Sequence, residues 1–248
     1  RVATLLVVVL FAGGAVGQGI RSVAPNGTGL STERLDRIGA VMKEHVDKGH
    51  VPGAIGLIYR RGKIGYFEKY GFQDKEAGVA MRKDTIFRMY SMTKPMTSAA
   101  LLMLFEEGKF QLTDPLSKYF PAFADAKVYT GRTPQGGMLL DSAKRQITVQ
   151  DIFRHTAGFS YGFGDSPVDK MYADANVFAT DLTGLMEKVG KMPLLYQPGD
   201  RWVYSVAHDV QAALVEKLSG QKFGEFVRQR IFRPLEMNES MVKGRADK

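Results

Sequence analysis

Ser91 and Lys94 form a Ser-x-x-Lys pair at the start of an apolar segment that runs from residue 93 to about 107. Residues three positions apart lie on one face of a helix, so the Lys94 amine can reach the Ser91 hydroxyl. Free N–H groups and the positive dipole end of the helix would stabilise an oxyanion beside Ser91. This pattern predicts a serine nucleophile activated by a lysine for acyl transfer. The alternative is an ordinary helix N-cap serine beside a solvated lysine.

The same four-residue pattern occurs twice more, at Ser219/Lys222 and at Ser240/Lys243. The first of these lies at a turn between two expected helices, and the second lies in a polar stretch near the C-terminus. Neither opens an apolar helix, so the context favours Ser91 as the nucleophile.

A second serine pattern, G-x-S-x-G, spans 158–162 and contains Ser160. A nucleophile elbow of this kind requires a strand before the serine and a helix after it. Here a helix-like segment precedes Ser160 and a loop rich in Gly and Asp follows it. Asp200 and His208 would complete the Ser…Asp…His chain order of the α/β-hydrolases, but these two residues are unusually close in sequence. The alternation of strands and helices that an α/β-hydrolase needs is also not visible. We therefore interpret Ser160 as a loop serine.

Tyr204 is the best candidate for the proton carrier that an acyl-enzyme reaction needs. A Pro198-Gly199 turn leads into Tyr204, and a helix is expected to start after Ser205, which we expect to be its N-cap. A tyrosine close to a lysine and to a helix N-terminus can have a lowered pKa. The alternative is a half-buried aromatic residue beside a loop.

Metal and cofactor chemistry has no support in the residue pattern. The chain has no cysteine, and its histidines, at positions 45, 50, 155 and 208, have no metal-binding spacing. His155 is expected to be a structural residue at a helix end. We expect neither a metal nor a cofactor.

The composition is that of an ordinary globular protein, with 44% hydrophobic and 24% charged residues among 248. It excludes disordered, collagen-like and coiled-coil proteins. The formal net charge is +8, but no block of Lys and Arg is interleaved with aromatic residues. We therefore expect no nucleic-acid partner.

The N-terminus resembles a secretory signal peptide. Arg1 precedes a short apolar run, Val2 to Ala12, and a small-residue stretch, Gly13 to Gly19. The run is shorter than the ~20 residues of a membrane-spanning helix, so we expect no integral span after cleavage. We assign 1–19 to the signal peptide, which implies a periplasmic or secreted protein. A buried strand or an uncleaved anchor is the alternative.

The remaining chain predicts a linker over 20–30 and a mixture of helices with few strands. A β-hairpin is expected over 52–71, with its turn at 60–63. The segments 130–142 and 158–169 are interpreted as loops, which leaves no second strand pair. A single hairpin is marginal as a sheet, so strands are expected to be missing from this chain. Helices are expected over 31–48, 93–107, 148–154, 182–189, 208–218 and 223–231.

Three motifs occur together in a familiar order: SMTKP from Ser91, HTAG from His155, and PGDRWVYS, which contains Tyr204. Together they resemble the serine β-lactamase-like superfamily, most closely class C β-lactamases and family VIII carboxylesterases. The resemblance covers about 31–248 as one domain. It implies an α/β fold of the α+β type, in which an antiparallel sheet is flanked by helices and joined by an all-α region. It also implies that Ser91 is the nucleophile, Lys94 its assisting base, and Tyr204 the general base or proton shuttle.

The resemblance also suggests which residues line the substrate pocket, namely Tyr90, Trp202, Ser205 and Val206. Class C enzymes have an asparagine two residues after the tyrosine, where this chain has Val206. That difference favours carboxylic esters over β-lactams or peptidoglycan. The family's third motif, a Lys-Thr-Gly or His/Trp-x-Gly strand, has no match after Tyr204. We therefore expect the chain to be incomplete at its C-terminus and to lack the late sheet strands.

The resulting hypothesis is a secreted serine hydrolase that cleaves small carboxylic esters through an acyl-Ser91 intermediate. One alternative is a β-lactamase or D-Ala-D-Ala carboxypeptidase, which would act on a β-lactam-like or peptide substrate. The other is a non-catalytic binding or scaffold protein, or an inactive fragment, of the same fold.

Overall fold

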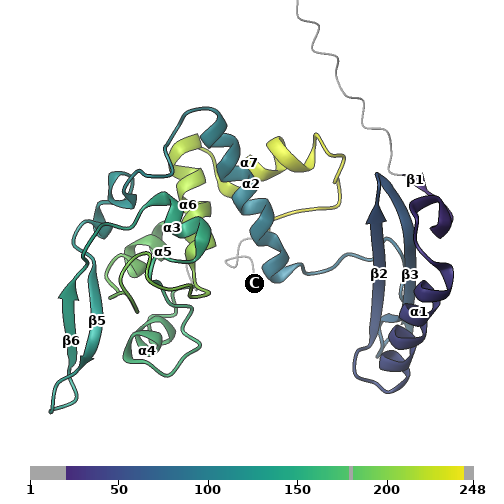
Figure 1. Ribbon diagram of the computed structural model, residues 1–248, viewed down its shortest axis with the longest axis horizontal. Coiled ribbons are helices and arrows are strands. Elements are labelled where there is room, and N and C mark those ends of the chain that lie inside the picture. Colours follow the sequence, from purple (N-terminus) through teal and green to yellow (C-terminus); the bar gives the residue numbers. More distant parts are fainter. Residues whose placement is uncertain (1–20, 179–180, 243–248) are drawn as a thin grey trace, which may run out of the picture. The chain divides into compact units, whose positions relative to one another are not determined.

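The computed structural model describes residues 21–178 and 181–242. The chain separates into two compact units, which divide between Arg88 and Met89, where the sequence predicted one domain over 31–248. Each unit is described by itself (Figure 1). The predicted signal peptide, 1–19, lies outside the described residues.

The first unit is a small sheet that packs against one helix. Its strand order is β1-β3-β2, and β4 also pairs with β3. β1 runs parallel to β3, whereas β2 and β4 run antiparallel to it. Its elements are β1 (Arg21–Ser22), η1 (Pro25–Thr28), α1 (Thr32–Asp47), β2 (Gly53–Arg60), β3 (Lys63–Asp74) and β4 (Val79–Ala80).

The predicted helix and hairpin of this unit are confirmed. The Ser31 side chain caps α1 by accepting a hydrogen bond from the Arg34 N–H, 3.4 Å away. The turn between β2 and β3 has Arg61 and Gly62 in the left-handed region, with φ of 53° and 74°. Two such residues in a two-residue turn match the twist of the strands that they join.

The predicted linker over 20–30 is wrong. Its residues carry β1 and η1, and the Val23 N–H donates to the Ile64 carbonyl at 3.0 Å. Thr28 is fully buried, and its hydroxyl donates to the Pro25 carbonyl at 2.6 Å. Gly, Pro and Asn suit a 3₁₀ turn as well as a linker, so composition alone could not separate the two.

The second unit is mainly helical, and α2 packs along α6 at its centre (Figure 1). Buried side chains from both helices, such as Leu101, Leu104, Val210 and Leu214, form much of the core. Its elements are η2 (Tyr90–Met92), α2 (Thr93–Glu106), η3 (Leu116–Lys118), η4 (Pro121–Phe123), β5 (Lys127–Arg132), β6 (Met138–Ser142), α3 (Val149–Arg154), α4 (Pro167–Asp174), α5 (Leu182–Val189), α6 (Ala207–Ser219), α7 (Phe223–Val227) and a π-helical turn, η5 (Arg228–Phe232).

The helices that the sequence predicted in this unit are present. The segment expected over 223–231 is α7 followed by the π-helical turn η5. None of the helices in the described ranges is long and apolar enough to cross a bilayer.

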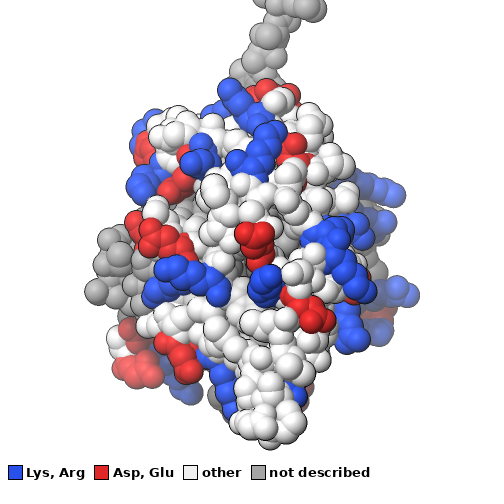
Figure 2. All heavy atoms as spheres, turned by 90° about the vertical axis from the view of Figure 1, so that its left-hand side faces the viewer, with Lys and Arg blue, Asp and Glu red and all other residues white. Residues whose placement is uncertain are grey.

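A second hairpin, β5–β6, replaces the loop predicted over 130–142. Val128 is its one fully buried apolar residue, whereas Leu139 and Leu140 are exposed. The pairing also shifts register between Tyr129 and Gly131. A mostly exposed, irregular hairpin lacks the alternation that marks a strand in sequence. Figure 2 shows the side on which β5 and β6 lie, where basic side chains are interspersed with acidic ones.

Candidate active site

Ser91, Lys94 and Tyr204 come together in the second unit, as the sequence predicted. The hydroxyl oxygens of Ser91 and Tyr204 lie 2.5 Å apart and share a hydrogen bond. The Lys94 Nζ donates to the Ser91 Oγ at 3.3 Å. The Lys94 Nζ also lies 4.6 Å from the centre of the Tyr204 ring.

The start of helix α2 determines where Ser91 lies. Tyr90 adopts a left-handed backbone conformation, with φ of 43°, and opens the 3₁₀ turn that contains Ser91. Ala100 and Leu101, about two turns along α2 from its first residue, are completely buried and fix the helix against the core. No side chain caps α2, so Ser91 is not the ordinary N-cap that the sequence left open as an alternative. Its hydroxyl bonds Tyr204 instead.

Tyr204 lies in the short segment that leads into α6, within a cluster of aromatic rings. Its ring stacks on Tyr161 at a centroid distance of 5.4 Å, with the planes 11° apart. The His155 ring lies 5.1 Å away, and the Trp202 ring 6.2 Å away. These rings limit the rotation of the tyrosine and hold its hydroxyl at Ser91.

The electrostatics of the site favour proton transfer at Tyr204. Burial raises the pKa of Tyr204, but hydrogen bonding with Lys94 and Ser91, together with the Lys94 charge, lowers it below its ordinary value. Burial lowers the pKa of His155, and the Lys94 charge lowers it further. A tyrosine with a lowered pKa beside a serine can accept the serine proton as a bond forms at Oγ.

Two of the predicted pocket residues are exposed beside this cluster. Tyr90 has 78% and Trp202 66% of its surface open to solvent. Tyr90 precedes Ser91 in the same 3₁₀ turn, and the Trp202 ring lies 6.2 Å from the Tyr204 ring.

The other two predicted pocket residues, Ser205 and Val206, are buried, and that prediction is wrong. The Ser205 hydroxyl lies 3.3 Å from His155 Nδ1, inside the protein. Val206 belongs to the core, and its N–H donates to the Ser160 carbonyl at 3.2 Å. Val206 is also the N-cap of α6, where the sequence predicted Ser205. The chain turns inward here because α6 packs on the core.

Ser160 is a structural residue in a loop, as interpreted from the sequence. Its side chain is completely buried and donates a hydrogen bond to the Asp169 carboxylate. Its oxygen accepts from the Gly162 N–H at 2.8 Å. No strand directly precedes Ser160 and no helix directly follows it in this described segment, so the geometry of a nucleophile elbow is absent.

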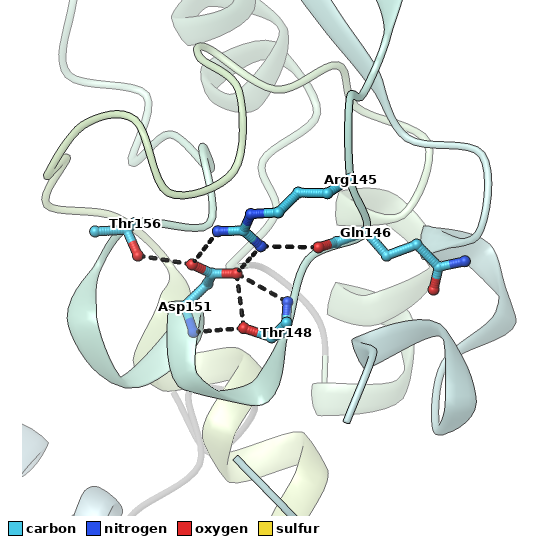
Figure 3. Close-up of polar contacts among 5 residues, drawn as sticks. All are labelled: Arg145, Gln146, Thr148, Asp151 and Thr156. Carbon is cyan, nitrogen blue, oxygen red and sulfur yellow. Dashed lines mark hydrogen bonds and ion pairs between the residues drawn. The ribbon is translucent and has the colours of Figure 1, made fainter. Parts of the chain in front are cut away.

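Asp151 is the centre of a polar network that the sequence analysis did not identify (Figure 3). Its carboxylate accepts two hydrogen bonds from the Arg145 guanidinium, at 2.6 and 2.9 Å. It also accepts hydrogen bonds from Thr148, with which it forms a capping box, and from the Thr156 hydroxyl at 2.9 Å. The T-x-x-D spacing at the start of α3 was the available signal. The network fixes the chain immediately after His155.

Metal-ligating side chains do not gather anywhere in 21–178 or 181–242. No three His, Asp or Glu residues in these ranges are placed to hold an ion.

Comparisons with known proteins show what this chain is similar to. The family model described as Beta-lactamase matches residues 38–247. Esterase EstB of Burkholderia gladioli is 31% identical over 209 residues, which are 82% of this chain and 50% of the esterase. Lovastatin esterase of Penicillium rubens is 33% identical over 198 residues, 79% of this chain and 50% of that enzyme.

The fold is also shared with a solved structure. EstCE1, described as a hydrolase with promiscuous acyltransferase activity, has a TM-score of 0.70 and 25% identity. The match covers 82% of this chain and 51% of that one. The chain thus spans about half the length of the relatives that it matches. It belongs to the Beta-lactamase family and has the β-lactamase/transpeptidase-like fold.

Proposed function

We propose that this chain carries the nucleophile of a serine hydrolase that cleaves small carboxylic esters through an acyl-Ser91 intermediate. The observation that carries the proposal is the contact between the Ser91 and Tyr204 hydroxyls, with the Lys94 ammonium donating to the same Ser91 oxygen. The names of EstB and lovastatin esterase support an ester as substrate.

The reaction follows from the three side chains. The Ser91 Oγ attacks the ester carbonyl carbon while its proton passes to Tyr204 in its phenolate form, which the Lys94 charge stabilises. Tyr204 then returns that proton to the departing alcohol, which leaves an acyl-Ser91 ester. A water molecule attacks this ester, gives a proton to Tyr204, and releases the carboxylic acid as Ser91 regains a proton. The Ser91 backbone N–H, at the start of α2, is one donor to the oxyanion of each step.

An amide substrate needs polar partners for its N–H and C=O groups, because an unpaired buried amide is costly. The position two residues after Tyr204, an asparagine in class C β-lactamases, is Val206 in this chain and offers no such partner. This sequence difference supports an ester over a β-lactam or a peptide.

We further propose that the protein works outside the cytoplasm, as a periplasmic or secreted enzyme with small-molecule substrates. The support is the sequence pattern of 1–19, a basic residue, an apolar run and a small-residue stretch.

The test compares turnover of a short-chain nitrophenyl ester with turnover of a chromogenic cephalosporin by the full-length protein. Ester turnover should dominate, and Ser91→Ala should abolish it. Ser160→Ala is the matched control, because Ser160 is a buried loop serine, and any folded Ser160→Ala protein should keep its turnover. Preferential cephalosporin turnover would contradict the ester proposal, and full activity in Ser91→Ala would contradict the assignment of the nucleophile.

A further inference from the structure

His155 holds the backbone on both sides of Tyr204. Its carbonyl oxygen accepts a hydrogen bond from the Val203 N–H at 2.8 Å. Its ring Nδ1 accepts one from the Ser205 N–H at 3.2 Å. His155 thus binds the residues directly before and directly after Tyr204. The His155 ring lies 5.1 Å from the Tyr204 ring.

The contact from the Ser205 N–H defines the protonation state of the imidazole. A backbone N–H can only donate, so the Nδ1 that receives the Ser205 N–H carries no proton. His155 is therefore a neutral imidazole with its proton on Nε2. The ring is buried, with 7% of the residue exposed, which disfavours the charged form.

The backbone of His155 is shaped for this double contact. It has a left-handed conformation, with φ of 56°, at the C-cap of α3. That conformation turns the chain so that the carbonyl and the ring of the same residue meet one extended segment. The next residue is also fixed, because the Thr156 hydroxyl bonds Asp151 and the Thr156 carbonyl accepts from the Gly199 N–H at 2.8 Å.

We propose that His155 is a positioning residue for Tyr204: it acts as a neutral, Nε2-protonated acceptor that clamps Val203 and Ser205 and so sets the Tyr204 hydroxyl against Ser91. The kinetic part of this proposal rests on the proposed ester hydrolysis. The structural part concerns the protonation state of His155 and its hydrogen bond with Ser205, and it does not rest on the proposed hydrolysis.

Three variants of the full-length protein separate the contributions. His155→Asn keeps an acceptor near the position of Nδ1, and asparagine tolerates the left-handed conformation. His155→Gly tolerates that conformation too but has no acceptor, so it isolates the loss of the side-chain contact. His50→Asn is the matched control, because His50 is exposed and lies in the other unit.

The kinetic expectation is a loss of kcat with little change in KM. A tyrosine displaced by about 1 Å costs about 10²-fold, so we expect His155→Gly to lose about that much. The loss should be larger for an alkyl ester, whose alcohol needs the Tyr204 proton, than for a nitrophenyl ester. His155→Asn should recover most of kcat, and His50→Asn should match the unmodified protein. A folded His155→Gly protein with unchanged kcat would overturn the proposal, and so would a His155→Asn protein as impaired as His155→Gly.

The structural expectation is tested without any turnover. Nitrogen-15 NMR of the histidines, assigned with His155→Asn, should show an unprotonated Nδ1 and a protonated Nε2 on His155 at neutral pH. The Ser205 amide should exchange with solvent slowly in the unmodified protein and in His155→Asn, and faster in His155→Gly. A protonated Nδ1, or equal exchange in all three, would overturn the clamp. Retained ester turnover in Ser91→Ala would refute the proposed function but not the role of His155. The nitrogen-15 NMR and the Ser205 amide exchange would still decide whether His155 is the clamp.

Discussion

The hydroxyl groups of Ser91 and Tyr204 lie 2.5 Å apart although 113 residues separate them in the chain. The start of α2 brings one, and the segment before α6 brings the other. These two helices pack along each other, so the core of the second unit sets the distance between the reacting oxygens.

Removing the tyrosine hydroxyl should slow ester cleavage and leave the fold intact. Tyr204→Phe keeps the ring that stacks on Tyr161 but loses the oxygen that takes the Ser91 proton. Loss of general acid–base catalysis of this kind costs about 10²–10⁴-fold in kcat. Steady-state kinetics with a nitrophenyl ester, beside a thermal melt, checks this. A Tyr204→Phe protein with normal kcat would show that another group carries the proton.

Lys94 should keep the tyrosine easy to ionise. Burial raises the pKa of Tyr204, and hydrogen bonding with Lys94 and Ser91 reverses that effect. In Lys94→Met the positive charge and its hydrogen bond are gone, so the pKa of Tyr204 should rise. Carbon-13 NMR of labelled tyrosine, followed as pH increases, reports this pKa directly. An unchanged or lower value in Lys94→Met would mean that the lysine does not act on Tyr204.

Asp151 should be a strong contributor to stability. Burial raises the pKa of Asp151, but hydrogen bonds from Arg145, Thr148 and Thr156 lower it by a larger amount. The net effect is a pKa below the ordinary value, so the folded protein holds the ionised form. Asp151→Asn removes the charge from a buried carboxylate that accepts hydrogen bonds from Arg145, Thr148 and Thr156, and it should cost about 1–3 kcal/mol of unfolding free energy.

Asp141→Asn is the matched control for this change, because Asp141 is exposed on β6. Its effect should stay within about 0.5 kcal/mol. Urea unfolding of both variants measures the difference. Equal stabilities would show that the network in Figure 3 contributes little.

His208 should make the protein less stable in mild acid. Burial, followed by Coulombic interactions with His155 and Lys94, lowers the pKa of His208 from 6.5 to about 4. Between these two values the unfolded chain binds a proton that the folded chain does not, so the free energy of unfolding falls as pH falls. The contribution should be about 1 kcal/mol, because the ring is partly open to screening by water.

His208→Phe removes this titration and keeps a ring beside His155. Chemical unfolding at a series of pH values between 7 and 4 should therefore give a flatter curve for this variant. The same slope in both proteins would assign the acid sensitivity to other groups.

Local signals predicted much of the fold. The helices predicted over 31–48, 93–107 and 148–154 are present as α1, α2 and α3. The hairpin β5–β6 was not predicted, because most of its side chains are exposed and its register is irregular. A strand that buries one residue leaves little pattern to read.

The site was predictable where its residues are local or carry a motif. Ser91 and Lys94 are three residues apart, and Tyr204 has a recognisable context. The predicted pocket roles of Ser205 and Val206 failed because sequence does not say which side of a helix start faces the core. The His155–Ser205 contact spans 50 residues and depends on a left-handed backbone at His155, which sequence does not reveal.

The most direct test of the account is to find which serine becomes acylated. The full-length protein is treated with a fluorophosphonate, digested, and its peptides are mapped by mass spectrometry. We expect one adduct, on Ser91, that disappears in Ser91→Ala and persists in Ser160→Ala. An adduct on Ser160, or continued labelling of a folded Ser91→Ala protein, would contradict the assignment of Ser91 as the nucleophile.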